Sequence, residues 1–171
     1  MRIVINDANI LIDLAKLELI KVFSKINFDL HTTDFIIEEL NEEQLVPVSK
    51  LIRSGKLTVI TTEDIQDFQA ITDILTTSNG LSFEDCSVWH YSKKLSGALL
   101  TGDGKLRKQA SRDGLEVRGI IFIFDELLKQ NLISFSVAIE KITILYQLNN
   151  RLPKKEIDHR IQIWREEKHV G

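Results

Sequence analysis

Acidic side chains occupy four positions where a charge is costly unless another charge compensates it. Asp7 comes just after the strand-like residues 2–5, and Asp103 comes just after the apolar residues 98–101. If these two strands are neighbours in a parallel sheet, both carboxylates reach the edge at which open α/β sheets bind ligands. Like charges about 4–6 Å apart raise a pKa strongly unless a cation lies between them. The pattern therefore favours a metal ion at this edge.

The two other acids, Glu39 and Asp85, lie in predicted helices. A helix turns by about 100° per residue, which places Glu39 within the apolar stripe of residues 35–40 and Glu38 outside it. In the later helix, the same construction places Glu84 nearer the apolar side than Asp85. Both also lie in the first turn, where the helix dipole favours any acid. Periodicity alone therefore does not choose between Glu84 and Asp85.

Each of the four acids also has an ordinary structural explanation. Asp7 and Asp103 stand where helix N-caps and turn residues occur. Glu39 has the position of a salt-bridged helix residue, and Asp85 has that of a first-turn acid. Their joint occurrence is more specific than any one of them, and no row of Cys or His competes with it. Hard carboxylate oxygens select Mg²⁺ or Mn²⁺ over zinc, so we expect one of these two ions.

Strand and helix signals alternate along the chain. Strands are predicted at residues 2–5, 30–32, 57–61, 98–101 and 115–117, and helices at 10–23, 35–40, from between 44 and 47 to 54, 63–75, 82–96, 105–112, 121–130, 134–148 and 153–168. Pro47 is expected in the first turn of its helix, because proline lacks the N–H that a helix interior needs. The alternation predicts an α/β fold with three α/β/α layers and a mainly parallel central sheet of four to five strands. We expect a domain at residues 1–132 and extra C-terminal helices, residues 133–171, packed on it.

Charge is unevenly distributed along this ordinary globular composition of 171 residues, 43% hydrophobic and 27% charged, with a net charge of −3. Residues 93–118 contain seven basic and three acidic side chains, whereas residues 29–43 contain six acidic ones and no Lys or Arg. The net charge argues against bulk affinity for nucleic acid. An acidic cluster beside a basic rim would nevertheless suit a metal site that receives a polyanion. The alternative is that these charges belong to solvated helix faces.

Three features favour a cytoplasmic protein. The single cysteine, Cys86, cannot form an internal disulfide, which fits a reducing compartment. The longest apolar run, residues 120–124, is far shorter than the roughly 20 residues that span a bilayer. Met1 leads directly into a strand pattern, so we expect no signal peptide and no membrane association.

Four short segments now resemble, in order and spacing, the motifs of PIN-domain nucleases. They are residues 7–11 (DANIL), 38–40 (EEL), 82–85 (SFED) and 99–106 (LLTGDGKL). The resemblance covers roughly residues 1–132, and it favours Asp85 over Glu84. Two departures from the family pattern are Gly104, where a second charged or polar residue is common, and the long extension after Leu132.

The resemblance implies a PIN-like fold and a Mg²⁺- or Mn²⁺-dependent endoribonuclease, often the toxin of a toxin–antitoxin pair. RNA would then be the substrate and an antitoxin protein the partner. Four metal ligands are implied, namely Asp7, Glu39, Asp85 and Asp103. As a hypothesis, Asn9 orients Asp7 or a metal-bound water, and Thr101 hydrogen-bonds a carboxylate or the attacking water. The basic residues Lys105, Arg107 and Lys108 would contact the phosphate backbone.

Two other functions compete with this interpretation. One is a non-catalytic PIN-like module that binds RNA or protein. The other is a haloacid-dehalogenase-like phosphatase, which requires a second aspartate where this chain has Asn9 and a further acid where it has Arg107. We therefore rank the phosphatase lowest.

The closing helix carries an apolar stripe made of Ile157, Ile161 and Trp164. The favoured interpretation is that this stripe packs onto its own domain, as in ordinary amphipathic helices. The alternative is a surface for an antitoxin or for a second copy in a homodimer.

Overall fold

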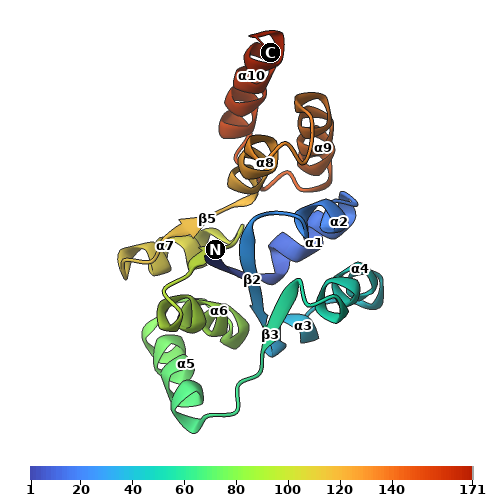
Figure 1. Ribbon diagram of the computed structural model, residues 1–171. Helices are drawn as coiled ribbons and strands as arrows, with labels where there is room; N and C mark the ends of the chain where they lie inside the picture. Colours follow the sequence, from blue (N-terminus) through green and yellow to red (C-terminus); the bar gives the residue numbers. More distant parts are fainter. Residues whose placement is uncertain (171) are drawn as a thin grey trace.

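Five strands form the central layer of the computed structural model, which describes residues 1–170 (Figure 1). Every neighbouring pair is parallel, and the strand order is β3-β2-β1-β4-β5. The strands are β1 (Arg2–Asn6), β2 (Phe28–Thr33), β3 (Leu57–Ile60), β4 (Ala98–Leu100) and β5 (Val117–Arg118). The predicted parallel sheet is confirmed. The first and fourth strands are neighbours, which meets the condition under which Asp7 and Asp103 reach the same edge.

Helices cover both faces of this sheet, with α1 and α4 on one side and α6 and α7 on the other (Figure 1). The helices are α1 (Ala8–Lys16), α2 (Ile20–Phe23), α3 (Asp34–Glu38), α4 (Glu42–Arg53), α5 (Ile65–Thr77), α6 (Phe83–Lys94), α7 (Gly104–Arg112), α8 (Ile120–Lys129), α9 (Phe135–Leu148) and α10 (Lys154–Val170). Between the layers, the central strands β1 and β4 bury Val4, Ile5 and Leu99 completely. Within residues 1–170, no helix combines the length and the apolar character that crossing a membrane requires.

The helix predicted at residues 10–23 is two helices, so that prediction is wrong. The chain turns at Glu18, whose φ of 56° lies in the left-handed region and ends α1. Ile20 and Phe23 are nevertheless buried, because the turn redirects α2 back onto the core. Apolar spacing misses such a break, since both helices keep their apolar residues inside.

Pro47 does not lie in the first turn of its helix, which corrects a second prediction. Helix α4 begins at Glu42, and Pro47 falls in the second turn. The start is set by a capping box, in which Asn41 Oδ1 accepts from Gln44 N (2.9 Å) and Gln44 Oε1 accepts from Asn41 N (3.0 Å). This cap outweighs the hydrogen bond that proline cannot donate to the carbonyl of Glu43.

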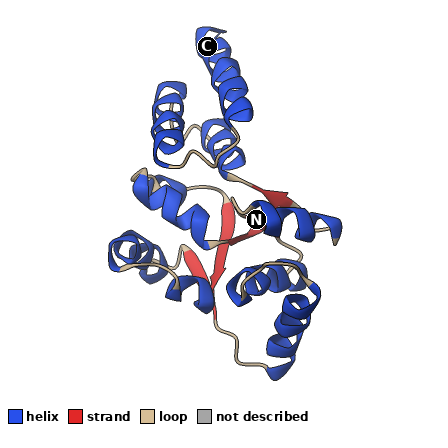
Figure 2. Ribbon diagram, turned by 180° about the vertical axis from the view of Figure 1, so that it is seen from behind, coloured by secondary structure: helices blue, strands red, loops and turns tan. Residues whose placement is uncertain are grey.

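The last three helices group at one end of the molecule, next to α1 and α2 (Figures 1 and 2). Helix α8 reaches β2, since the rings of Phe122 and Phe28 stack with their centroids 6.1 Å apart. Trp164 of α10 is 1% exposed, and its ring centroid lies 5.9 Å from that of Phe124 in α8. Its indole Nε1 donates to Asp125 Oδ1 at 3.1 Å. Ile157 is also buried, so α10 turns its apolar stripe toward the rest of the chain.

We predict that Trp164→Ala destabilises the protein by about 3–5 kcal/mol, because it leaves a cavity between α8 and α10 and removes the donor to Asp125. Urea unfolding followed by circular dichroism measures this change. The control is Gln162→Ala on the exposed side of the same helix, which should stay within about 0.5 kcal/mol of the wild type. Equal effects of the two substitutions would contradict the packing described here.

Candidate active site

Asp7 stands at the carboxyl end of β1 and joins it to the neighbouring strand β4. Its backbone N–H donates to the carbonyl of Leu100 (3.0 Å), which continues the parallel pairing one residue beyond β1. Its side chain is the N-cap of α1, since Oδ1 accepts from Ala8 N at 2.7 Å. Asp7 is only 2% exposed. The strand and the helix together therefore hold a carboxylate inside the protein at this edge of the sheet.

Two polar side chains fix the second oxygen of Asp7. Thr101 Oγ1 donates to Asp7 Oδ2 at 2.6 Å and accepts from the backbone N–H of Asp103 at 3.0 Å. Asn9 Nδ2 donates to the same Oδ2 at 2.9 Å, while its Oδ1 accepts from Gly102 N at 2.7 Å. Of the partners that the sequence left open for Asn9 and Thr101, the structure shows the carboxylate of Asp7. These hydrogen bonds connect Asp7 to the turn that carries Asp103.

Asp103 and Asp85 both help to begin helices. Asp103 is the N-cap of α7, and its Oδ1 accepts from Leu106 N at 2.7 Å. Asp85 forms a capping box at the start of α6, where its Oδ2 accepts from Ser82 N at 2.9 Å. These are the structural roles that the sequence left open. Each role occupies one carboxylate oxygen, and within residues 1–170 the other oxygen has no hydrogen bond from protein.

The charges of these acids act on one another at Asp7. The pKa of Asp7 is raised to about 6. Burial is the largest cause, the charges of Asp85 and Asp103 add to it, and the hydrogen bonds from Thr101 and from the backbone N–H of Ala8 oppose it. Burial also raises the pKa of Asp85, with the charges of Asp103 and Glu84 adding to the effect. No basic side chain contributes to either shift. This edge of the sheet therefore carries negative charge that the protein itself does not balance.

Glu39 joins this group from a different position than the helical wheel predicted. Helix α3 ends at Glu38, so Glu39 is the C-cap residue, and it is exposed rather than on the buried face. The wheel was continued past the end of the helix, which is why that prediction is wrong. The pKa of Glu39 is raised to about 7, first by desolvation and then by the charges of Asp7, Glu84 and Asp85. The carboxylate of Glu39 thus still acts on the others.

Glu84 is an acid of this group that the sequence motifs passed over. Its charge raises the pKa of both Glu39 and Asp85. The helical wheel had placed it near the apolar side of its helix, but the resemblance favoured Asp85. Only the approach of α3 to the start of α6 brings Glu84 into the group, and no sequence spacing encodes that approach.

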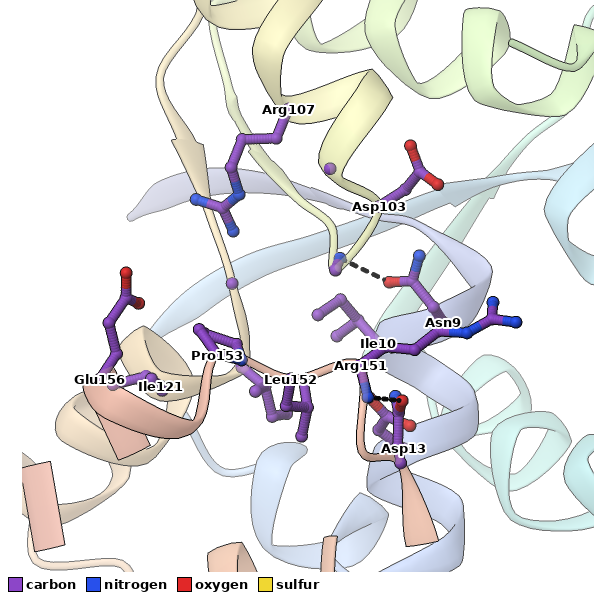
Figure 3. Close-up of a pocket in the computed structure, with 15 residues that line it drawn as sticks. Asn9, Ile10, Asp13, Asp103, Arg107, Ile121, Arg151, Leu152, Pro153 and Glu156 are labelled. Carbon is purple, nitrogen blue, oxygen red and sulfur yellow. Dashed lines mark hydrogen bonds between the residues drawn. The ribbon is translucent and has the colours of Figure 1, made fainter. Parts of the chain in front are cut away.

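A pocket of about 590 Å³ opens beside this acidic edge (Figure 3). Asn9 and Asp103 contribute to its lining, whereas Asp7, Glu39 and Asp85 do not. The facing wall comes from the turn between α9 and α10, far along the chain. The acidic edge is therefore continuous with a cavity that the C-terminal helices help to form.

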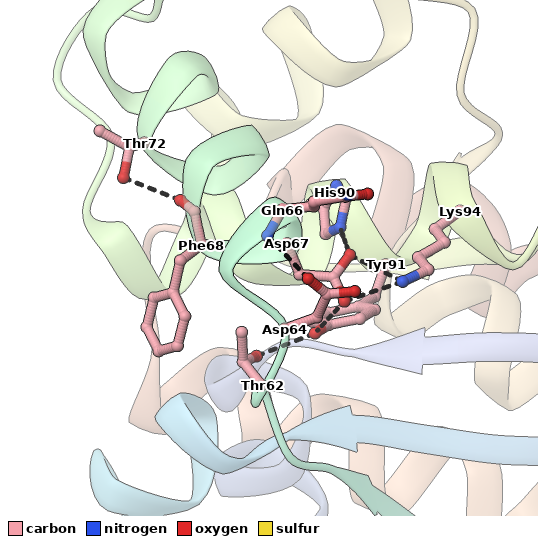
Figure 4. A network of polar contacts seen from close by, with 9 residues as sticks. All are labelled: Thr62, Asp64, Gln66, Asp67, Phe68, Thr72, His90, Tyr91 and Lys94. Carbon is pink, nitrogen blue, oxygen red and sulfur yellow. Dashed lines mark hydrogen bonds and ion pairs between the residues drawn. The ribbon is translucent and has the colours of Figure 1, made fainter.

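A second polar cluster lies between α5 and α6 (Figure 4). In contrast to Asp7, its buried carboxylate is paired with a cationic side chain. Asp67 is 8% exposed and accepts from Lys94 Nζ at 2.7 and 2.8 Å. It also lies 2.7 Å from His90 Nε2, and Tyr91 OH donates to it at 3.4 Å. The hydrogen bond from Lys94 lowers the pKa of Asp67. Asp7 has no such cationic partner.

The donor set at the acidic edge fits a hard divalent cation in its chemistry. Carboxylate oxygens are the ligands that Mg²⁺ and Mn²⁺ prefer, and the charge there lacks any other balance. Among residues 1–170, however, no three Asp, Glu, His or Cys side chains are arranged closely enough to surround an ion. Carboxylates repel one another without a cation between them, so binding would require some of these side chains to move inward.

Comparisons with known proteins identify one family and a number of structural neighbours, two of which are described here. A family model described as PIN domain matches residues 3–166. VapBC2 from Rickettsia felis, solved bound to a promoter DNA fragment, aligns with 14% identity and a TM-score of 0.48 over 68% of this chain and 98% of that one. VapBC-1 from nontypeable Haemophilus influenzae aligns with 19% identity and a TM-score of 0.49 over 68% and 97%. A search of curated proteins found no match.

We predict that Asp7 makes the metal-free protein less stable as the pH rises. Its folded pKa of about 6 lies above the ordinary 3.8, so the folded state holds the proton more tightly and stability falls as pH rises between these values. Asp7→Asn should reduce the decline in unfolding free energy between pH 5 and 7.5 by about 1–2 kcal/mol. Urea unfolding in EDTA at the two pH values measures it.

The matched control for this experiment is Asp73→Asn, on the exposed face of α5. It should keep the full decline of the wild type. If the unfolding free energy of Asp7→Asn also falls as much as that of the wild type between pH 5 and 7.5, the pKa of Asp7 is not raised and another group balances its charge.

Proposed function

The chain belongs to the PIN-domain family, and from that premise we propose that it is a Mg²⁺- or Mn²⁺-dependent endoribonuclease that hydrolyses RNA phosphodiester bonds. One observation carries the proposal. The buried carboxylate of Asp7 lies at the carboxyl end of the sheet and interacts with the charges of Asp85 and Asp103, and no cationic partner for it is found among residues 1–170. A carboxylate cluster of this kind is costly in a protein that does not bind a cation.

In this proposal, Asp7, Glu39, Asp85 and Asp103 hold the metal. A bound divalent cation supplies two things: a lowered pKa for water near the phosphate, and neutralisation of the charge that develops on the phosphate oxygens. We prefer Asp85 to Glu84 because the motif resemblance does. Glu84 is the alternative ligand, and comparing Asp85→Asn with Glu84→Gln in a metal titration decides between them.

The protein's own contribution is to hold these groups in place before substrate arrives. The hydrogen bonds from Thr101 and Asn9 keep Asp7 Oδ2 in one orientation. Because Thr101 also accepts from Asp103 N, and Asn9 accepts from Gly102 N, the two strand ends are tied to each other. Such preorganisation lowers a barrier, because no reorganisation is needed during the reaction.

Basic side chains lie on the helix that Asp103 begins. Lys105, Arg107 and Lys108 are exposed in the first turns of α7. Contacts of this kind to phosphate oxygens position a nucleic acid without selecting its sequence. We propose that they align the RNA strand along the acidic edge.

The toxin role, an antitoxin partner, a homodimer and a cytoplasmic location remain predictions of the sequence and the resemblance. The neighbouring reading frames test the first two. A small upstream gene with a DNA-binding pattern would support a toxin–antitoxin pair, and co-purification of its product with this chain would identify the partner.

We predict that the purified protein cleaves single-stranded RNA with Mg²⁺ or Mn²⁺ and that EDTA abolishes cleavage. Asp7→Asn and Asp103→Asn should each lower kcat/KM by about 100-fold or more, because each removes a ligand charge. Asn9→Ala should lower it by about 10- to 100-fold, as expected for a residue that orients a ligand. Gel analysis of a labelled oligoribonucleotide measures all three.

The control is Asp73→Asn, which should cleave like the wild type. Cleavage that is equal in the wild type, Asp7→Asn and Asp103→Asn would refute the proposal. Calorimetric titration with Mn²⁺ then separates the remaining possibilities, since a non-catalytic module would bind no divalent ion. Turnover of a chromogenic phosphate ester would instead favour the phosphatase.

A further inference from the structure

The pocket beside the acidic edge has two walls from distant parts of the chain. One wall carries Asn9, Asp103 and Arg107, and the other is the turn of residues 149–153 with Glu156 of α10 (Figure 3). The turn is ordered by its own hydrogen bonds, because Asn149 Oδ1 accepts from Arg151 N at 3.2 Å. The C-terminal helices therefore present a defined surface to the candidate active site.

An arginine on the first wall is held in place by backbone. Arg107 Nη2 donates to the carbonyl of Thr101 at 3.1 Å. The guanidinium also lies against Gly119, where a Cβ atom would come within 2.6 Å of Nη2. Glycine at position 119 thus leaves room for the guanidinium beside the strand end. The remaining N–H groups of Arg107 have no partner within residues 1–170, and Figure 3 shows the guanidinium directed toward the pocket.

The second wall supplies another arginine and an apolar surface. Arg151 is exposed, and no ion pair engages it within the described chain. Leu152, Pro153 and Ile121 line the pocket as a hydrophobic surface. Guanidinium groups bind phosphate strongly, and an apolar surface suits the face of a base.

Two carboxylates add hydrogen-bond acceptors to this pocket. Asp13 is 6% exposed, lines the pocket and has no hydrogen-bond partner within residues 1–170. Glu156 lies on the opposite wall (Figure 3). An acceptor-only group recognises donors, and RNA offers them as the 2′-hydroxyl and as N–H groups on base edges.

We propose that this pocket binds one nucleotide of single-stranded RNA next to the scissile phosphate. The phosphates on the two sides of that nucleotide lie at Arg107 and at Arg151, whose guanidinium groups are on opposite sides of the pocket (Figure 3). The base lies on Leu152 and Pro153, and Asp13 and Glu156 accept from the ribose and the base. The inference rests on the proposed ribonuclease function and extends it, because it makes the C-terminal helices part of substrate selection. The pocket volume is within the range of about 300–1,000 Å³ that small-ligand sites occupy.

The test measures binding of a fluorescein-labelled single-stranded oligoribonucleotide by anisotropy, in EDTA, over a range of salt concentrations. The parent is full-length Asp85→Asn, an inactive background whose change does not line the pocket. In this background, Arg151→Ala should weaken binding about tenfold and reduce the slope of log K against log salt by about 0.7, the value for one single-stranded phosphate contact. Arg151→Lys should restore most of the slope, because it restores the charge.

The matched control is Arg165→Ala, an exposed arginine of α10 outside the pocket, which should bind like the parent. In the active protein, Arg151→Ala should raise KM about tenfold with kcat unchanged, as expected for a contact made equally before and during reaction. Asp13→Asn should reduce the ratio of the affinity for RNA to the affinity for DNA of the same sequence.

The outcomes separate this inference from the proposed function. If Arg151→Ala and Arg165→Ala bind RNA with equal affinity and equal salt slopes, the proposal that this pocket binds a nucleotide is refuted, even if the wild type cleaves RNA. A failure of Arg151→Lys to restore the slope would also overturn it, since the role would then be structural. A wild type that cleaves no RNA would refute the nuclease function, while the binding measurement would still decide what the pocket holds.

Discussion

The parallel pairing of β1 with β4 is the constraint on which the site depends. Both strands stop at the same edge, because Asn6 pairs with Leu100 and Asp7 N donates to the Leu100 carbonyl. The chain then leaves each strand as a helix capped by an aspartate. Two carboxylates that are 96 positions apart in the sequence thereby come to one place. The other acids, the orienting amide and the basic helix are all arranged around that edge.

This constraint could be predicted from the sequence, because it follows from local signals. A buried strand that ends in aspartate appears twice, and alternation of strands and helices implies parallel neighbours. The sequence also offered Asn9 and Thr101 as polar neighbours of a carboxylate, and both donate to Asp7. The predictions that were wrong depended on the conformation of single residues or on contacts between distant segments. The turn at Glu18 leaves the apolar spacing intact, and Glu39 lies past a helix end that only the backbone geometry defines.

The contribution of the C-terminal helices could not be read from the sequence for a different reason. The apolar stripe with Trp164 favoured packing of α10 within its own chain, but an amphipathic pattern does not identify the surface against which a helix packs. The turn before α10 forms a pocket wall opposite Arg107, and this contact joins segments more than 40 residues apart. Residue types at that turn, an arginine between two asparagines and a proline, are ordinary for a loop. Only the fold gives them a place near the acids.

Asp7 and Asp103 each perform two tasks, and the two can be lost separately. The side-chain oxygen that caps a helix is present in asparagine as well as in aspartate, whereas the negative charge is not. If the proposed nuclease function holds, a descendant released from selection for cleavage can therefore drift to asparagine at either position and keep both helices. Drift to alanine would leave a helix N–H without its acceptor. Relatives that have retained the scaffold for binding alone should carry amides at these two positions, which would mark them as former enzymes.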